Sequence, residues 1–271
     1  HREIGETMKA EVNDLTDLLK RTRRMANVNG KPIPQVIGCV LQTSDGIMTT
    51  TSVVMDGKSS VARFVGVCES TDEETIVVPD IEMMLGALKS HTGKVTLKQD
   101  GDMLRMKSFN KQTSLSADER ALAFPHTSET VLEWATMSQQ KMKAVRSDSY
   151  MMADGSERDA VFSTTVDGQD LREAIADGNM NGQKVSTFRL LVMDHALGVV
   201  VGTPLKGQTN TQIGHLKGRY EANIVFGGGL ESVIPNGEVK LSLVSYHKEG
   251  QGYALILDSP EGRIYQRSVL E

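Results

Sequence analysis

Two stretches of this chain, residues 74–118 and 221–271, contain the same elements in the same order, and this internal repeat constrains the fold more than any other feature. Each stretch opens with a β-branched strand, Thr75–Val78 in the first copy and Asn223–Phe226 in the second. A Gly or Pro break, a short helix and a Gly-x-Val-x-Leu strand follow in both. Because one such unit cannot bury its apolar face alone, the repeat predicts two similar domains.

The short helices of the repeat are predicted at 81–90 and 230–234. The strands that follow them, 93–97 and 237–241, read Gly-Lys-Val-Thr-Leu and Gly-Glu-Val-Lys-Leu. Two further strands close each copy. A chance similarity of two β meanders is the alternative, but the shared order of strand, helix and Gly-x-Val-x-Leu favours a true repeat.

An amphipathic helix precedes the first copy. Its apolar residues recur at spacings of four and three, the pattern of one buried helix face: Met8, Val12, Leu15, Leu19, Thr22 and Ala26. The helix is expected to end near Gly30, because Pro32 and Pro34 cannot continue it. Three strands complete the first half, at 35–42, 47–54 and 61–68.

The second half has a comparable order. A strand at 161–166 leads to Asp167, which is predicted to cap a short helix that stops at Gly178. The apolar face of this helix is formed by Leu171, Ala174 and Ile175. A hairpin is predicted from 188–194 and 197–203, followed by a strand at 217–226.

These patterns predict an α+β fold of two similar domains, each with two helices packed on antiparallel sheets. The expected boundaries are 1–118 for domain 1, 119–158 for an interdomain connector and 159–271 for domain 2. Within the connector, residues 121–125 form an apolar patch, and residues 131–145 have the pattern of an extra amphipathic helix.

The composition is that of a globular protein, with 39% hydrophobic and 24% charged residues. No apolar run approaches the roughly 18 residues of a membrane-spanning helix, and no secretory signal is visible. We therefore expect an intracellular protein without a membrane partner, in the cytoplasm of a prokaryotic host or in a eukaryotic nucleus. The net charge of −5 excludes a chain that is basic throughout, but not a local basic strip.

Motifs for metal binding or catalysis are missing or incomplete. Cys39 and Cys68 lie in strand-like apolar runs, which favours two buried thiols, with a disulfide as the alternative. They form no zinc site with a spaced histidine pair. Residues 57–59 read Gly-Lys-Ser, but they lie between two strands and lack the earlier Gly of a phosphate-binding loop. Asp194-His195 is interpreted as a surface pair rather than an acid–base pair, so we expect no enzyme activity and no cofactor or metal.

Five segments together resemble DNA sliding clamps of the proliferating cell nuclear antigen type and of phages. They are 76–80 (Ile-Val-Val-Pro-Asp), 85–88 (Leu-Gly-Ala-Leu), 95–97 (Val-Thr-Leu), 103–108 and 122–126 (Leu-Ala-Phe-Pro-His). The resemblance covers residues 60–126, and the repeat extends the same fold to the rest of the chain. The connector departs from the family, because it is longer than the usual interdomain loop.

The resemblance implies a homotrimeric ring of six similar domains that encircles double-stranded DNA, with helices lining the hole. It also implies three kinds of protein partner: a DNA polymerase, other proteins with clamp-binding peptides, and a clamp loader. Lysine and arginine on the inward helices would attract phosphates without reading the base sequence. The basic residues expected at the DNA are Lys9, Lys20, Arg21 and Arg24 on the first helix, Lys89 on the second and Arg172 on the third. The alternative is that they form solvated helix faces, with cations near a helix C-terminus.

The resemblance further implies a groove that takes the hydrophobic anchors of a partner peptide. The connector segment with Leu122, Phe124 and Pro125 matches the apolar anchor of that groove, and Ile47 and Val269 are further candidates. Exposed apolar patches often mark such sites. The alternative is that these residues only hold the connector against the sheet.

The sequence therefore favours a non-enzymatic processivity factor that encircles DNA. One rival keeps the fold but not the ring: a monomeric, viral-type processivity factor that binds DNA on one basic face. The other rivals are a β-rich hydrolase, for which no nucleophile–base pattern is evident, and a structural virion protein.

Overall fold

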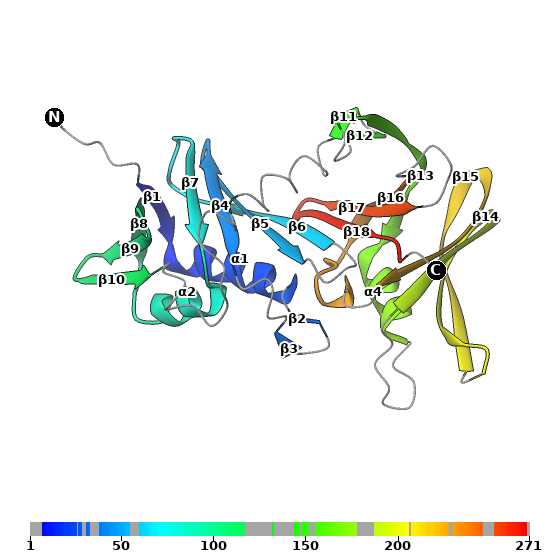
Figure 1. Cartoon of the computed structure of the whole chain (residues 1–271), viewed down its shortest axis with the longest axis horizontal. Helices are drawn as coiled ribbons and strands as arrows, with labels where there is room; N and C mark the ends of the chain where they lie inside the picture. Colours follow the sequence, from blue (N-terminus) through cyan, green and yellow to red (C-terminus); the bar gives the residue numbers. More distant parts are fainter. Residues whose placement is uncertain are drawn as a thin grey trace. The chain divides into compact units, whose positions relative to one another are not determined.

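The protein is described by a computed structural model, shown in Figure 1. The structure describes residues 7–25, 27–28, 31–32, 38–54, 60–116, 132, 144–146, 148–151, 155–177, 187–205, 207–227, 230–245 and 252–269. The chain divides into two compact units. The first contains His1–Ala26, Pro32–Val54 and Ala62–Met137, and the second contains Asn27–Lys31, Met55–Val61 and Ser138–Glu271.

The first unit is built on two antiparallel sheets. One has the strand order β1 (Met8–Glu11), β8 (Lys94–Asp100), β9 (Met103–Ser108) and β10 (Lys111–Ser116). The other has the order β6 (Ser60–Val67), β5 (Ile47–Val54), β4 (Cys39–Ser44) and β7 (Glu74–Val78). Two very short strands, β2 (Asn27–Val28) and β3 (Lys31–Pro32), pair with each other. Of these, Asn27, Val28 and Lys31 are counted with the second unit.

Two helices pack together on these sheets, α1 (Val12–Met25) and α2 (Ile81–Leu88). The predicted apolar stripe of α1 is confirmed from Val12 to Thr22, since those members are all buried. Thr22 remains satisfied in the core because its hydroxyl bonds the Leu18 carbonyl at 2.8 Å and the Thr50 hydroxyl at 2.6 Å. Helix α2 is capped by Asp80, whose carboxylate accepts from the Met83 N–H.

The second unit has one larger sheet and one long ribbon. The sheet has the order β11 (Ala144–Arg146), β12 (Ser149–Met151), β13 (Glu157–Asp167), β16 (Glu238–Ser245), β17 (Tyr253–Ser259) and β18 (Gly262–Arg267). The ribbon pairs β14 (Thr187–Thr203) with β15 (Gly207–Gly227). Helix α4 (Gly168–Ala176) and the 3₁₀ turn η3 (Leu230–Ser232) pack against each other, and α4 also contacts the ribbon.

The structure confirms the internal repeat. The order β1-β8-β9-β10 in the first unit matches β13-β16-β17-β18 in the second. Where each helix begins, the same backbone bond forms: the Val12 N–H donates to the Gly93 carbonyl at 2.8 Å, and the Gly168 N–H donates to the Gly237 carbonyl at 2.6 Å. Both acceptor glycines have a positive φ, +68° and +83°, which explains why each copy has glycine there.

Two predictions for the first unit need correction. The first helix begins at Val12, because Met8–Glu11 form strand β1, with Met8 and Ala10 buried and Lys9 exposed. This alternation suits a strand, and β1 pairs with β8 in the register Met8↔Leu97. The second helix is shorter than predicted and ends at Leu88.

In the second unit, the predicted hairpin at 188–203 is wrong. Residues 187–203 form one long strand with an irregularity at Asp194, and its partner is β15 rather than itself. The predicted helix at 230–234 is the 3₁₀ turn η3. The extra helix predicted at 131–145 lies outside the described residues, apart from Leu132 and the two residues at its end, Ala144 and Val145, which belong to strand β11.

Cys39 and Cys68 are free thiols, so the disulfide alternative is wrong. Burial raises the pKa of the Cys39 thiol to about 12. Burial also raises the pKa of Cys68, although its contact with the Ser70 carbonyl acts in the opposite direction. Both thiols are therefore expected to be unreactive near neutral pH.

Candidate functional site

The polar face of α1 has an uneven charge distribution. Its first half contains Asp14 and Asp17, and its second half contains four bases: Lys20, Arg21, Arg23 and Arg24. Cations in the last turns of a helix complement its dipole, so part of this pattern has a structural reason. Four bases against two acids still leave α1 with excess positive charge.

The basic side chains of α1 differ in their exposure and in their interactions with the rest of the unit. The Lys20 side chain is 53% exposed and lies 3.6 Å from Asp17. Arg21 is half-buried, and its guanidinium donates to the Val65 carbonyl at 3.1 Å. Arg23, which was not among the predicted DNA residues, lies 3.4 Å from Glu82 on α2. The side chain of Arg24 lies outside the described residues.

The other predicted DNA residues are not all on helices. Lys9 was predicted on the first helix but lies on strand β1, where its backbone N–H bonds Ser70 Oγ at 2.7 Å. Lys89 is exposed at the C-cap of α2. Arg172 lies on α4 as predicted, but its guanidinium bonds the Ile234 carbonyl and the Asn236 side chain within the second unit. Arg172 therefore stabilises the contact between α4 and the segment after η3.

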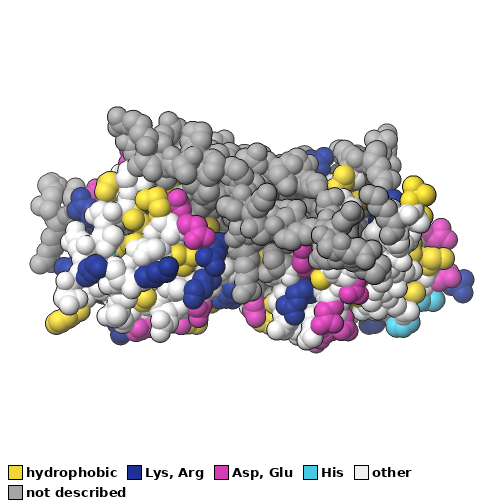
Figure 2. Space-filling model, turned by 90° about the horizontal axis from the view of Figure 1, so that it is seen from below, with side chains coloured by type: hydrophobic (Ala, Val, Ile, Leu, Met, Phe, Trp, Pro, Cys, Tyr) yellow, Lys and Arg dark blue, Asp and Glu magenta, His cyan; other side chains and the backbone are white. Residues whose placement is uncertain are grey.

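Helix α4 contributes no excess of positive charge. It contains Asp170 and Glu173 beside the single base Arg172, and η3 adds Glu231. On the face in view in Figure 2, Lys and Arg side chains are interspersed with Asp and Glu. Among the described helices, the basic character is concentrated on α1.

Of the predicted docking residues, Ile47 is the best placed. It is 47% exposed and lines a pocket of about 540 Å³ at the turn between β4 and β5. Val269 is half-buried, and its N–H donates to the Val225 carbonyl at 2.8 Å. Leu122, Phe124 and Pro125 lie outside the described residues.

The pocket around Ile47 is mostly polar, which sequence reasoning missed. Asp45, Glu73 and the buried Glu74 line it together with Arg63. The ladder explains this convergence, because β4 pairs with β7 in the register Thr43↔Glu74 and so places the turn beside Glu73. Glu73 is distant from the turn in the sequence, so the sequence alone did not indicate that the two lie side by side.

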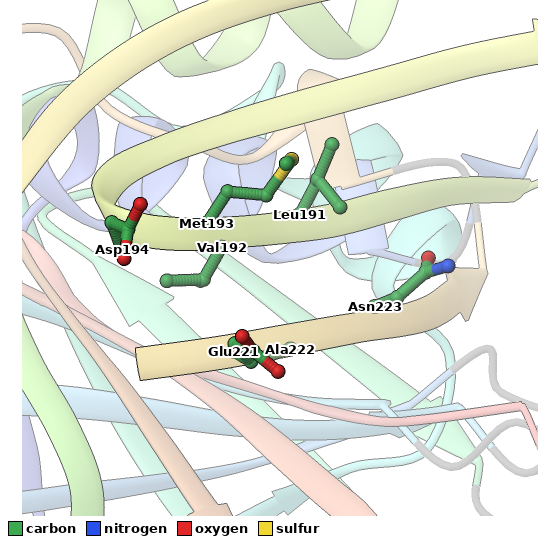
Figure 3. Close-up of a pocket in the computed structure, with 7 residues that line it drawn as sticks. All are labelled: Leu191, Val192, Met193, Asp194, Glu221, Ala222 and Asn223. Atoms are coloured by element: carbon green, nitrogen blue, oxygen red, sulfur yellow. The ribbon is translucent and has the colours of Figure 1, made fainter. Parts of the chain in front are cut away.

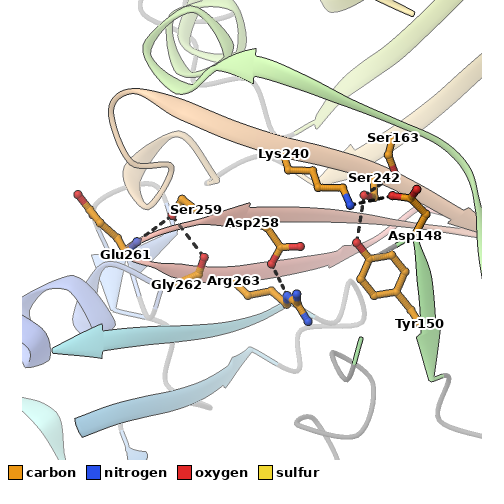
Figure 4. A network of polar contacts seen from close by, with 10 residues as sticks. All are labelled: Asp148, Tyr150, Ser163, Lys240, Ser242, Asp258, Ser259, Glu261, Gly262 and Arg263. Carbon is orange, nitrogen blue, oxygen red and sulfur yellow. Dashed lines mark hydrogen bonds and ion pairs between the residues drawn. The ribbon is translucent and has the colours of Figure 1, made fainter. Parts of the chain in front are cut away.

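A polar network fixes the end of the predicted connector to the second unit (Figure 4). Tyr150 is fully buried, and its hydroxyl donates to Ser242 Oγ at 3.1 Å. Asp148 accepts from Lys240 Nζ at 2.7 Å, and the Arg263 guanidinium lies 5.7 Å from the centre of the Tyr150 ring. Residues 148–151 are thereby anchored on the sheet through β12.

The described residues contain one serine–histidine contact, which bears on the hydrolase alternative. His91 Nδ1 lies 2.8 Å from Ser108 Oγ, and Nε2 lies 2.9 Å from Thr113 Oγ1. A nucleophile–base–acid arrangement would place a carboxylate where Thr113 is. Both His91 and Ser108 are also buried, at 3% and 7% exposure, so a substrate has no access. This triplet ties the segment that follows α2 to the β9–β10 hairpin.

Within the part of the chain that the structure describes, no group of three or more potential ligands could hold a metal ion. No helix there is long and apolar enough to cross a membrane.

No known protein family and no curated protein matches the sequence. Solved structures do match. The DNA polymerase III subunit beta of Pseudomonas aeruginosa aligns with a TM-score of 0.64 and 13% identity, over 98% of this chain and 65% of that one. The beta subunit of Thermotoga maritima gives 0.62 and 12%, over 100% and 69%. The DNA polymerase sliding clamp of Bacillus subtilis gives 0.61 and 11%, over 99% and 65%.

The chain thus spans about two thirds of the length of these proteins. At this level of identity the likeness concerns the fold. It confirms the resemblance to sliding clamps and the predicted α+β class over nearly the whole chain.

Proposed function

We propose that this chain, which has the fold of a DNA sliding clamp, is a DNA polymerase processivity factor that encircles duplex DNA and tethers the polymerase. The single observation that carries the proposal is the agreement in fold with DNA polymerase III beta subunits and sliding clamps over 98–100% of the chain. The role is that of a scaffold without enzyme activity. Its partners are a polymerase, other proteins with clamp-binding peptides and a clamp loader, and its place is inside the cell.

A ring requires surfaces that join one copy to the next. Two of the strands that end a sheet or ribbon, β10 and β15, are considered for this role. Among the described residues, β10 pairs in a ladder only with β9, and the first half of β15 pairs only with β14. An unpaired strand edge presents N–H and C=O groups that another chain can complete. We propose that β10 of one copy and β15 of the next pair in this way, and that three copies close the ring.

Contact with DNA is proposed to rest mainly on α1. Lys20 on α1 and Lys89 at the end of α2, both exposed, are the strongest candidates for phosphate contacts, and Arg24 on α1 stays a predicted one. Lys9 and Arg172 are weaker, since Lys9 lies on a strand and Arg172 is bonded within its own unit. Such contacts attract the backbone of any sequence, which suits a protein that slides.

Partner docking is proposed at the pocket that includes Ile47. Leu122, Phe124 and Pro125 of the connector stay predicted apolar anchors for a partner peptide, and Val269 in the second unit stays a separate prediction. An apolar residue beside acidic and amide groups would select a peptide with both a hydrophobic and a polar side chain.

A second candidate function is a monomeric processivity factor that binds DNA on one face. The concentration of positive charge on α1, with none in excess on α4, favours it. A monomeric factor would need neither paired strand edges between copies nor a clamp loader.

The DNA assignment is tested by a charge reversal, Lys20→Glu with Lys89→Glu. Arg21 is left intact because its bond to the Val65 carbonyl makes it part of the fold. Fluorescence anisotropy on a short duplex should show affinity lower by about tenfold. The dependence of log affinity on log salt concentration should become shallower by about one for each phosphate that the protein no longer neutralises.

The matched control is Lys98→Glu with Lys107→Glu, the same charge change on the polar positions of β8 and β9. It should leave affinity nearly unchanged. An equal fall in affinity in both double variants would contradict the assignment to α1 and indicate a general effect of net charge.

A further inference from the structure

The pocket at Ile47 has a counterpart in the second unit, and the strand ladders align the two residue by residue. In the first unit Gln42 pairs with Thr75 and Thr43 with Glu74; in the second, Leu191 pairs with Asn223 and Val192 with Ala222. Since the repeat aligns Thr75 with Asn223, it also aligns Gln42 with Leu191 and Ser44 with Met193. The next residues, Asp45 and Asp194, share a positive φ of 51° and 54°.

The counterpart is a pocket of about 430 Å³ on the β14–β15 ribbon, lined by Leu191, Val192, Met193, Asp194, Glu221, Ala222 and Asn223. Figure 3 shows Leu191 and Met193 on the same side of β14, with Asp194 at its bend and Glu221 on β15. The fold is the same as at Ile47, but the walls differ in chemistry. Gln42 and Ser44 are replaced by leucine and methionine.

The strand pairing does not require an exposed apolar side chain at this corner. Met193 is 64% exposed, and the first unit builds the same corner with Ser44. Removing a methionine side chain from water is favourable. Because Met193 stays exposed in the folded chain, it contributes little of this burial free energy to folding. A ligand that covers Met193 and Leu191 would gain it instead.

The rim of the pocket is acidic. Asp194 and Glu221 are exposed, and among the described residues neither carboxylate forms an ion pair or a hydrogen bond. Two uncompensated carboxylates beside an apolar floor complement a cation next to a hydrophobic group. Lysine or arginine beside leucine, methionine or phenylalanine in an extended peptide has that combination.

We propose that the pocket around Met193 and Glu221 is a second docking site, for an extended segment of a partner protein with an apolar side chain beside Lys or Arg. This inference does not depend on DNA binding. It gives each chain two related pockets of different chemistry, so that partners with different peptides could occupy one chain together.

The test uses short random peptides displayed on phage, selected on the wild-type chain after depletion on the variant Leu191→Gln with Met193→Ser. That variant gives the second unit the residues of the first, so it should fold, and an unchanged melting temperature checks this. The enriched peptides should combine an apolar residue with Lys or Arg, and their affinity in anisotropy should be about tenfold lower for the variant.

A second variant, Asp194→Asn with Glu221→Gln, removes the charges and keeps the shape, because asparagine tolerates the positive φ at 194. It should weaken the same peptides and abolish the salt dependence of their binding. Failure to enrich any peptide, enrichment without basic residues, or equal affinity for the wild-type chain and both variants would overturn the proposal.

Discussion

At the residue scale, Asp45 and Asp194 show how one neighbour changes the path of the chain. Both adopt a positive φ at the same place in the repeat. Asp45 is followed by Gly46, which also has a positive φ, and two such residues in succession form the tight turn of a β-hairpin. Asp194 is followed by His195, which does not. The first unit therefore reverses direction, whereas β14 only bends and continues.

His91 is the residue for which the structure predicts a pH dependence. Its pKa lies below the ordinary value of 6.5, because burial disfavours the charged imidazolium and the nearby Lys111 repels it. The folded state thus binds fewer protons than the unfolded state in mild acid. The stability due to neutral His91 is complete above pH 6.5 and is lost as the pH falls below it, toward the folded-state pKa.

Urea denaturation at pH 7.5 and pH 5 should therefore show a loss of unfolding free energy in the wild type. The variant His91→Gln keeps hydrogen-bonding groups toward Ser108 and Thr113. Its free energy of unfolding should fall less between pH 7.5 and pH 5. If both proteins lost the same amount, His91 would not be the titrating group.

At the element scale, α4 offers a direct test of helix capping. The Asp167 carboxylate accepts from the Gln169 N–H at 2.8 Å and the Asp170 N–H at 3.2 Å. Asp167→Ala leaves both donors without this acceptor and should lower the free energy of unfolding by about 1 kcal/mol. Asp167→Asn, which retains a cap oxygen, should cost much less, and a similar loss in both variants would show that the cap bond is not the cause.

The sequence predicted those elements whose signal is local. Asp167 as a cap and the buried stripe of α1 were predicted correctly because capping and helical periodicity are encoded within a few residues. The start of α1 was misplaced because Met8 fits both a helix face and an alternating strand, and only pairing with Leu97 decides between them. The hairpin at 194 was wrong because the position after Asp194 lacks the glycine that completes the turn in the first unit.

The candidate site was less predictable for the same reason. The run of basic residues on α1 is visible in the sequence. The hydrogen bonds from Arg21 to the Val65 carbonyl and from Arg172 to the Ile234 carbonyl are not, because each acceptor is distant in the chain. The acidic walls of both pockets come from strand pairing. An alternating pattern shows that a strand has two faces, but not which strand lies beside it.

At the scale of the whole molecule, the fold places two copies of one unit in each chain. Within the described ranges, β10 in the first unit and the first half of β15 in the second each pair with one strand only. Ring closure would pair them, and retention on DNA would then be topological, so that the modest positive charge of α1 is enough. On the proposed ring, topological retention would let a chain with a net charge of −5 hold DNA.

The central claim is tested most directly by the mass of the protein in solution, measured by light scattering on a sizing column. The chain has a mass of 29.6 kDa, and a closed ring of three copies predicts three times that value, independent of dilution over a wide range. A monomeric mass at every concentration would contradict the self-assembled ring and favour the one-faced processivity factor.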